Sequence, residues 1–415
     1  MTRVLVVDDS PFMRTVIDNA LTTAGYNVET ATNGSEATDL AATYDPDVIT
    51  MDVEMPECNG IDAVEQIMAT NPALILMLSV HTDRGTEATL DALERGAVDF
   101  LHKPDGSDSR TVTHLTTDVV EKVDELANAN ASSVALARAA ASAYATRSAS
   151  VEGAGTTSQA VAGTGEADSN PLARTETTSH PPTGPGPDPS AETGLGSEPT
   201  GSANDGTHPL VGDTATLAEN PTVVLGASTG GPKIIEGLFE RLPADLEAKV
   251  LVVQHMPAEF TERFAHRLDS RSEYDVREAA DGELLRSGEV AVAPGDAHLE
   301  VTSNVGGRLR LRLDDGDPLH GVRPAIDVTM QTAAEQVDDR LCGIVLTGMG
   351  ADGAAGIEAI KAAGGHTIAQ DEATSPVFGI PCQAIKTGCV DTVVPAPALV
   401  ETIVGAFNTD GETDD

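Results

Sequence analysis

The chain has 415 residues, 40% of them hydrophobic, a size and composition that allow two or three globular domains, each with its own core. Its formal net charge of −41 excludes a protein that binds nucleic acid or an anionic membrane, because both partners need a basic surface. The same charge would destabilise a folded chain through self-repulsion unless salt screened it, so we expect a high-salt cytoplasm, as in a halophilic organism.

Neither a signal peptide nor a transmembrane helix is expected. The first residues run directly into the apolar stretch Val4–Val7, and no apolar run reaches the roughly 18 residues that a membrane-spanning helix needs. The 4 cysteines form no CxxC pair, and Cys342 lies within an apolar run, as a small core residue does. We therefore expect a cytoplasmic protein with no membrane insertion and no zinc-binding or catalytic cysteine.

Residues 1–125 alternate between short apolar runs and amphipathic helical patterns. The apolar runs are Val4–Val7, Val48–Met51, Leu74–Leu78 and Val98–Leu101. This alternation predicts a parallel sheet with helices on both faces, which is the doubly wound α/β architecture.

Residues 126–219 are predicted to link two domains. An alanine-rich stretch that can extend a helix comes first, and from about residue 148 the composition falls to Gly, Pro, Ser, Thr, Ala and acids. Such a segment buries too little apolar surface to offset its chain entropy, so we expect a long disordered linker. Strand and helix patterns return over residues 220–408, which predicts a second doubly wound α/β domain, and residues 409–415 form an acidic tail.

Polar residues follow the predicted strands of the first domain. In chain order they are Asp8, Asp9, Asp52, Ser79 and Lys103. Because the carboxyl ends of parallel strands meet at one edge of a sheet, we expect these side chains to converge. Converging carboxylates repel one another unless a hard cation such as Mg²⁺ joins them, and a nearby lysine and hydroxyl would suit a phosphoryl group. The alternative is a set of solvated loop acids in a very acidic protein.

The first domain resembles response-regulator receiver domains. The resemblance rests on Asp8-Asp9, on Met51-Asp52-Val53-Glu54-Met55-Pro56, on Ser79 and on His102-Lys103-Pro104. It implies a flavodoxin-like fold in which Asp52 accepts a phosphoryl group from a histidine kinase. It also implies that Asp8 and Asp9 bind Mg²⁺ together with Asp52, and that Ser79 and Lys103 contact the phosphoryl oxygens.

Three strand-like apolar runs in the second domain are each followed by a short segment that carries one polar residue, and two of these segments are rich in glycine. These residues are Ser228, His255 and Asp352. All three would leave the sheet at the edge where α/β proteins gather their chemistry, so they are candidates for one nucleophilic site. Gly226-Ala227-Ser228-Thr229-Gly230 also matches the G-x-S-x-G nucleophile elbow, although a tight turn without chemistry gives the same pattern.

Other residues compete for roles in this site. His298, which follows the apolar run Val290–Ala293, is the second candidate for the base, whereas His366 begins a strand and would face the opposite edge. Gly348-Met349-Gly350-Ala351-Asp352-Gly353 also fits a dinucleotide-binding fingerprint, but a Rossmann unit needs more strands than can follow it. The glycines fit better a loop that orients Asp352 and leaves backbone donors free for an oxyanion.

The second domain resembles the chemotaxis protein-glutamate methylesterase family. The motifs that carry the resemblance are Gly226–Pro232, Gln254-His255-Met256, Ala293-Pro294-Gly295, Arg323–Asp327, Leu346–Gly353 and Ala369–Thr374. With the receiver-like domain in front, they reproduce the two-domain layout of that family, and the charge indicates a member from a halophilic archaeon. Two departures are Cys382, where we expect a basic residue, and the length of the linker.

The family implies hydrolysis of glutamate γ-methyl esters on chemoreceptor cytoplasmic helices and deamidation of selected receptor glutamines. Ser228 would be the nucleophile, His255 the general base and Asp352 the residue that orients the imidazole. The backbone N–H groups of Met349 and Thr229 are our candidates for the oxyanion donors, and the hydrolase site needs no cofactor.

The family also implies that the unphosphorylated receiver-like domain blocks the hydrolase site and that phosphorylation of Asp52 by a chemotaxis histidine kinase frees it. Two other functions stay open. One is an adaptor that binds receptors or kinase without catalysis. The other is a general small-ester hydrolase, which would need a deep apolar pocket near Ser228.

Overall fold

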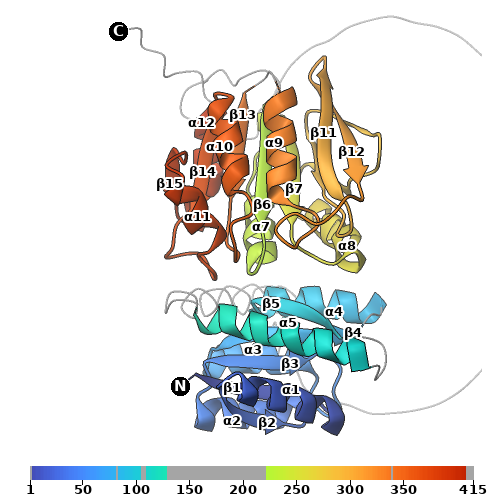
Figure 1. The fold of residues 1–415 in the computed structure, drawn as a ribbon, viewed down its shortest axis with the longest axis vertical. Helices are drawn as coiled ribbons and strands as arrows, with labels where there is room; N and C mark the ends of the chain where they lie inside the picture. The colour runs from blue at the N-terminus through green and yellow to red at the C-terminus, as the bar shows by residue number, and fades with distance from the viewer. Residues whose placement is uncertain (1, 81–82, 104–108, 129–220, 338–339, 408–415) are drawn as a thin grey trace, which may run out of the picture. The chain divides into compact units, whose positions relative to one another are not determined.

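The computed structural model describes residues 2–80, 83–103, 109–128, 221–337 and 340–407, and Figure 1 shows their fold. The predicted disordered linker and the acidic tail lie outside the described residues. Within the described part of the chain, no helix is both long enough and apolar enough to cross a bilayer. All of these described residues belong to one compact unit.

The N-terminal sheet has five parallel strands in the order β2-β1-β3-β4-β5. They are β1 (Arg3–Val7), β2 (Asn27–Ala31), β3 (Val48–Asp52), β4 (Leu74–Val80) and β5 (Asp99–Lys103). The helices that alternate with them are α1 (Pro11–Thr23), α2 (Gly34–Tyr44), α3 (Gly60–Thr70), α4 (Asp83–Arg95) and α5 (Ser109–Ala127). The sequence did not predict β2, because this edge strand exposes most of its side chains and carries no apolar run.

Alternation along each buried strand divides the N-terminal core between the two faces of the sheet. Leu5 and Val7 of β1 pack in one apolar cluster with α2 and α3, and Val4 and Val6 pack in another with α1 and α5. Helix α1 begins where Ser10 Oγ accepts a hydrogen bond from the backbone N–H of Met13 and a proline takes the first helical position. This is the doubly wound architecture that the sequence predicted.

The second sheet has seven parallel strands in the order β15-β14-β13-β6-β7-β10-β8. They are β6 (Thr222–Ala227), β7 (Lys249–Gln254), β8 (Asp275–Glu278), β10 (Glu289–Val292), β13 (Leu341–Val345), β14 (His366–Gln370) and β15 (Thr392–Val394). The helices of this domain are α7 (Gly231–Phe239), α8 (Ala258–Asp269), α9 (Ile326–Gln336), α10 (Ala354–Ala362), α11 (Ile380–Lys386) and α12 (Leu399–Phe407), with short 3₁₀ turns η1 (Ala244–Leu246) and η2 (Ala396–Ala398).

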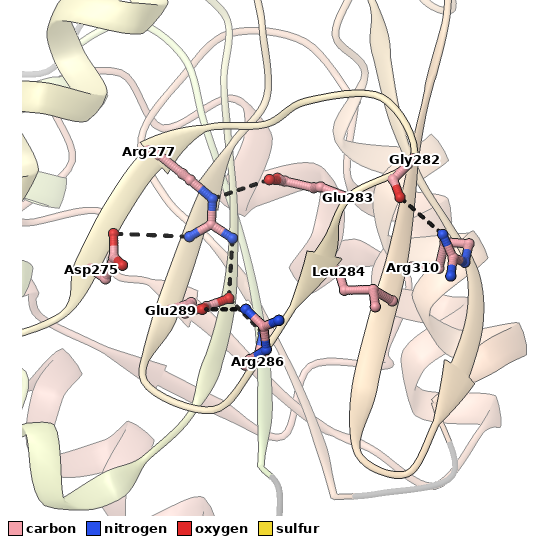
Figure 2. Close-up of a pocket in the computed structure, with 8 residues that line it drawn as sticks. All are labelled: Asp275, Arg277, Gly282, Glu283, Leu284, Arg286, Glu289 and Arg310. Atoms are coloured by element: carbon pink, nitrogen blue, oxygen red, sulfur yellow. Dashed lines mark hydrogen bonds and ion pairs between the residues drawn. The ribbon is translucent and has the colours of Figure 1, made fainter.

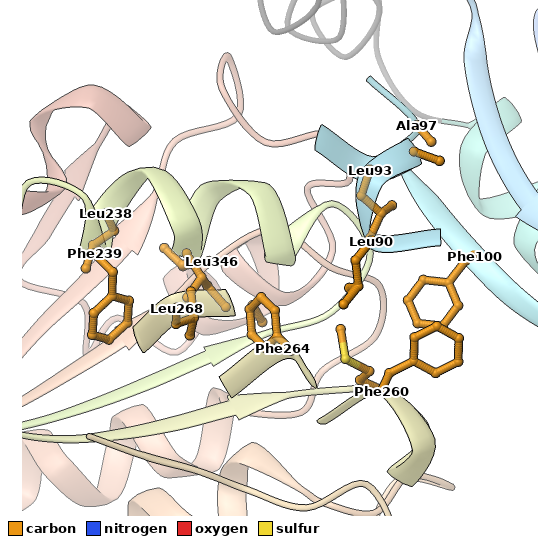
Figure 3. Close-up of a cluster of buried hydrophobic side chains, with 14 of the residues drawn as sticks. Leu90, Leu93, Ala97, Phe100, Leu238, Phe239, Phe260, Phe264, Leu268 and Leu346 are labelled. Atoms are coloured by element: carbon orange, nitrogen blue, oxygen red, sulfur yellow. The ribbon is translucent and has the colours of Figure 1, made fainter. Parts of the chain in front are cut away.

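Helices cover both faces of the second sheet. One apolar cluster joins Val223 and Leu225 of β6 to α7, α8 and α12, and Figure 3 shows part of it. The opposite cluster joins Val224 of β6 to α9, α10 and α11, and Figure 1 shows α9 and α10 side by side along that face. Cys342 is fully buried in β13, as expected for a small core residue, and burial raises the pKa of its thiol.

A separate three-stranded antiparallel sheet, which the sequence did not predict, is built from segments on both sides of β10 in the chain. It is formed by β9 (Leu284–Leu285), β11 (His298–Val305) and β12 (Arg308–Asp314) in the order β11-β12-β9. Its buried leucines, such as Leu309 and Leu311, join the cluster that contains α9.

The order of the second sheet reverses direction around β6. Strand β7, which follows β6 in the chain, lies on one side of it, and β13 lies on the other side. In open α/β sheets such a switch point opens a crevice at the carboxyl ends of the strands, where ligands bind. The residues that follow β6, β7 and β13 are therefore brought together by the topology.

Candidate active site and phosphoacceptor site

Ser228 stands in a strand–turn–helix between β6 and α7. Its backbone N–H donates to the carbonyl of Thr347, which lies just after β13 (3.0 Å), and its own carbonyl accepts from Gln254 Nε2 (3.0 Å) and from the N–H of Gly231 (2.8 Å). Helix α7 begins at Gly231 with a proline in its first turn, as the nucleophile-elbow pattern predicted. The turn is therefore fixed by hydrogen bonds to both neighbouring strand ends.

Two glycines explain why this turn tolerates no side chain. Gly348 has a φ of +152°, and a Cβ built on it would lie 2.6 Å from the Cβ of Ser228. A Cβ on Gly231 would lie 2.1 Å from Oε1 of Gln254. Since real Cβ contacts are essentially never this short, a larger residue at Gly348 must displace the Ser228 loop, and one at Gly231 must displace Gln254 or Ala227.

The partly buried His255 and the buried Asp352 form a hydrogen-bonded pair. Nε2 of His255 lies 2.8 Å from Oδ2 of Asp352. Burial opposes the ionisation of Asp352, but hydrogen bonds from His255 and from the backbone N–H groups of Asp327 and Ile326 outweigh it and hold the pKa of Asp352 below its ordinary value. Asp352 is thus suited to accept the imidazole N–H and to stabilise an imidazolium.

The three sequence candidates follow three adjacent strands, β6, β7 and β13. Ser228 Oγ makes no hydrogen bond to His255 among the described residues. With Nε2 bonded to Asp352, Nδ1 is the imidazole nitrogen left for the serine. In unliganded active sites the hydrogen bond between nucleophile and base is often long, and it tightens only when substrate is bound.

His298, the second candidate for the base, is held by backbone groups on both sides of its ring. Its Nδ1 accepts from the N–H of Ala325 (3.1 Å), and its Nε2 lies 3.1 Å from the carbonyl of Asp317. The ring is buried and fixes the start of α9. As expected, His366 begins β14 at the other end of the strand, where Nδ1 lies 3.6 Å from Asp391.

Met349 and Thr229 were the candidates for oxyanion donors. Met349 follows Gly348 in the loop after β13, and Thr229 directly follows Ser228. Neither backbone N–H donates to another group within the described part of the chain, so both have donor capacity. The Met349 side chain is half-exposed.

Three carboxylates converge at the end of the N-terminal sheet, as predicted. Asp8, Asp9 and Asp52 can offer one ligand oxygen each, all within 4.8 Å of one another. Lys103 Nζ lies 2.8 Å from Asp8 Oδ2 and 2.8 Å from Asp52 Oδ2. Ser79 of β4 is also buried at this edge of the sheet.

Burial changes the acid–base properties of this carboxylate group. It raises the pKa of Asp52 to about 6, because the attraction of Lys103 offsets only part of the desolvation and the charge of Asp8 adds repulsion. Burial opposes the charge of Lys103, but Asp52 and Asp8 more than compensate and raise the pKa of Lys103. A divalent cation would relieve the repulsion among the three acids.

Comparison with known proteins places both domains in families. A family model described as CheB methylesterase matches residues 223–403, and one described as response regulator receiver domain matches residues 4–114. Curated relatives named protein-glutamate methylesterase/protein-glutamine glutaminase come from Halobacterium salinarum (44% identical, covering 98% of this chain and 99% of the relative), Haloarcula marismortui (45%, 98% and 98%) and Pyrococcus abyssi (39%, 97% and 93%).

The chain belongs to the protein-glutamate methylesterase/protein-glutamine glutaminase family. The resemblances that the motifs gave are therefore confirmed for both domains. Two of these relatives come from halophilic archaea, which agrees with the interpretation of the −41 charge as an adaptation to salt.

In this methylesterase-family chain, receiver-domain residues contact the loop that carries Ser228. The hydroxyl of Thr229 donates to Asp99 Oδ2 of β5 (2.7 Å), Lys122 Nζ of α5 lies 2.5 Å from the same hydroxyl, and the N–H of Gly230 donates to the carbonyl of Val98 (3.1 Å). These contacts occupy polar groups within two residues of Ser228.

Helix α4 of the receiver domain pairs with α7 and α8 of the methylesterase domain. Arg267 on α8 bonds to Asp91 (3.1 Å) and Glu94 (2.5 Å) of α4 and to the buried Glu236 of α7 (2.6 Å). The rings of Phe100 and Phe260 lie 4.2 Å apart, and both are visible in the apolar cluster of Figure 3. The receiver–methylesterase contact is therefore both apolar and ionic.

An open hollow of about 530 Å³ beside β8, β9 and β10 contains none of the candidate site residues. Arg277 bonds there to Glu283 and Glu289 (3.1 Å each), as Figure 2 shows. Arg286 also pairs with Glu289, and Arg310 bonds to the carbonyl of Gly282. The lining acids and arginines balance in number, so this hollow has no net charge with which to attract a charged ligand.

The sequence did not reveal the roles of Gln254, Asp327 and His320 around the site. Gln254 and Asp327 lie within motifs that carried the family resemblance, but their contacts depend on helix and strand neighbours that are distant in the chain. Gln254 follows the apolar run Val250–Val253, but His320 has no such run beside it and carries no local signal.

Proposed function

We propose that the protein hydrolyses glutamate γ-methyl esters on the cytoplasmic helices of chemoreceptors and deamidates selected receptor glutamines during chemotaxis adaptation. The observation that carries the proposal is the convergence of Ser228, His255 and Asp352 at the ends of three adjacent strands, with the 2.8 Å bond between His255 and Asp352. The names of the relatives support the choice of substrate.

The reaction begins with attack of Ser228 Oγ on the side-chain carbonyl carbon of the substrate. The hydroxyl proton moves to Nδ1 of His255, while Asp352 accepts the Nε2–H and stabilises the imidazolium. The backbone N–H groups of Met349 and Thr229 would hold the oxyanion of the tetrahedral intermediate.

Collapse of this intermediate breaks the bond to methanol, or to ammonia in a glutamine, and His255 returns its proton to that leaving group. Water then attacks the acyl-serine with His255 again as the base, which releases glutamate and restores the serine hydroxyl. Ester and amide hydrolysis thus need the same residues and no cofactor.

We further propose that Asp52 accepts a phosphoryl group from a chemotaxis histidine kinase. The clustering of Asp8, Asp9 and Asp52 oxygens supports Mg²⁺ binding by these three residues, and the ion would neutralise charge on the transferred group. Lys103 already bridges Asp8 and Asp52, so it is positioned to contact phosphoryl oxygens, with Ser79 at the same strand edge.

Phosphorylation would control the hydrolase by weakening the receiver–methylesterase contact. The bonds from Asp99 and Lys122 to Thr229 support an inhibited unphosphorylated state, because a bulky receptor helix would have to displace them to reach Ser228. A shift of this equilibrium on phosphorylation would free the site.

The test is methanol release from methyl-labelled receptor membranes in multimolar salt, with and without a small-molecule phosphodonor. We expect stimulation by the phosphodonor in the native protein and none in Asp52→Ala. Receptor binding without any methanol release would instead support the adaptor function, and release from small esters only would support a general esterase.

A further inference from the structure

Helices α9 and α10 take their N-terminal caps from each other's aspartates. Neither helix has a side-chain cap at its own N-cap residue, Ala325 for α9 and Gly353 for α10. Asp352, just before α10, accepts the N–H groups of Ile326 (2.7 Å) and Asp327 (2.9 Å) at the start of α9. Asp327 Oδ1 in turn accepts two backbone N–H groups at the start of α10.

The bonds from Asp327 fix the backbone next to Asp352. Its Oδ1 accepts from the N–H of Gly353 (2.9 Å) and of Gly356 (2.7 Å). Each bond satisfies a helix-terminal donor that would otherwise lack a partner. Asp327 is 1% exposed, so bulk water does not compete for these bonds.

Close packing makes this arrangement rigid. A Cβ on Gly356 would lie 2.5 Å from the Cβ of Met330, so α10 approaches α9 as closely as a glycine allows. A Cβ on Gly353, which has a φ of +95°, would lie 3.1 Å from Cγ2 of Ile326. The two helices lie side by side in Figure 1, so we expect a change at one N-terminus to displace the other.

His320 holds the second oxygen of Asp327. Its Nε2 lies 2.8 Å from Oδ2 of Asp327. The histidine stands in a tight turn closed by two hydrogen bonds between Leu319 and Val322 (3.1 and 3.0 Å). His320 and Gly321 both have positive φ, +56° and +79°, as in a type I′ turn. A non-glycine residue keeps such a φ only where its surroundings determine it, and the bond to Asp327 is such a determinant.

We propose that Asp327 is a positioning residue for the hydrolytic reaction, fixed in place by His320. It rests on the function proposed above, because it acts through Asp352 and His255 and does not touch the substrate. By holding the first turn of α10, Asp327 sets the position of Asp352, whose Oδ2 orients the imidazole of His255. The network therefore orients the His255–Asp352 pair before a receptor glutamate is bound.

The same residues could be taken for a metal site, since His320, Asp327 and Asp352 can offer ligand atoms within 4.8 Å of one another. Hydrogen bonding argues against this. Both carboxylates already accept backbone N–H groups, and the positive ends of two helix dipoles point at them. A cation would have to displace these donors, so the network is a hydrogen-bonded one.

The experiment compares Asp327→Ala, Asp327→Asn and His320→Ala with Thr329→Val as the matched control. Thr329 lies on the same helix, is fully buried and donates to the carbonyl of Leu299 (2.6 Å), so its loss costs a buried hydrogen bond unconnected to Asp352. Asparagine keeps the Oδ1 that accepts from α10, whereas alanine removes it. The His320 side chain is 42% exposed and lies in a surface turn, so we expect its variant to leave the core intact.

Each full-length protein is assayed for kcat and KM of methanol release and for the rate at which a fluorophosphonate labels Ser228. We expect Asp327→Ala to lower both kcat and the labelling rate by about 10- to 100-fold, because misplaced supporting groups have effects of this size. His320→Ala should lower kcat by a smaller factor. KM should change by less than about twofold in each, because substrate contacts are intact.

Asp327→Asn and Thr329→Val should stay within about threefold of the native kcat. The proposal is overturned if Asp327→Ala is as active as Thr329→Val, if Asp327→Asn is as slow as Asp327→Ala, or if His320→Ala has full activity. Failure of the proposed function gives a different result from failure of the Asp327 proposal. In that case Ser228→Ala would still release methanol, or the native protein would release none. In assays without a phosphodonor, insensitivity to EDTA and to added Zn²⁺ supports the hydrogen-bonded network, whereas activation by Zn²⁺ under these conditions would overturn it.

Discussion

Replacing Asp52 by asparagine should stabilise the protein, although it removes the proposed phosphoacceptor. Asp52 is 5% exposed, and burial raises its pKa from 3.8 to about 6 despite its ion pair with Lys103. One pKa unit corresponds to about 1.4 kcal/mol, so ionising this carboxyl costs the folded state up to about 3 kcal/mol relative to the unfolded chain. Asparagine has no charge to bury and keeps an oxygen for Lys103.

The sign of the effect depends on pH. Below about pH 4 Asp52 is protonated in the folded and in the unfolded protein, and the variant has no advantage. Between pH 4 and about 6 the unfolded chain ionises first, so the native protein loses stability relative to the variant. Above about pH 6 the difference is complete and constant.

The assay is urea unfolding in concentrated KCl with EDTA at pH 4 and pH 8, together with hydrogen exchange of the β1 and β3 amides as a local measure of the N-terminal core. Glu54→Gln, which removes an exposed acid two residues away, is the control for formal charge. Millimolar Mg²⁺ at pH 8 should stabilise the native protein and reduce the difference. Equal stability of the variant and native protein at pH 8, or an equal advantage at both pH values, would refute the reasoning.

Two further substitutions test the nucleophile loop and its control. Gly348→Ala should lower kcat about 100-fold, because the new Cβ would lie 2.6 Å from the Cβ of Ser228. Gly237→Ala is the control and should leave kcat unchanged, because its Cβ would meet nothing within 4 Å. Unchanged kcat in Gly348→Ala would show that the loop is not rigid. Glu94→Ala removes the 2.5 Å ion pair with Arg267, so it should raise methanol release without phosphodonor several-fold. The rate with phosphodonor should not change. A lower rate without phosphodonor would contradict the inhibitory contact.

Residues at strand ends were predictable from the sequence alone. Apolar runs locate buried parallel strands, and in a doubly wound sheet the carboxyl ends of those strands share one edge. This logic brought Ser228, His255 and Asp352 together, and it did the same for Asp8 and Asp52. It also separated His366 from the site, because that histidine begins its strand.

The parts that the sequence did not reveal depend on contacts between elements distant in the chain. Strand β2 has too few buried side chains to show an apolar run. Gly356 and Asp327 have local surroundings typical of any helix, and only the close approach of α10 to α9 gives them a role. His298 could not be dismissed from sequence, because its bonds to Ala325 and Asp317 come from loops folded over it.

The measurement that tests the central claim most directly is methanol release from methyl-labelled receptor membranes by native protein and by Ser228→Ala. Both proteins would be assayed in multimolar salt, each with and without a phosphodonor. The account predicts release that the phosphodonor stimulates in the native protein and that is absent in the variant. Equal release by the two proteins would contradict the serine mechanism, and release indifferent to the phosphodonor would contradict control through Asp52.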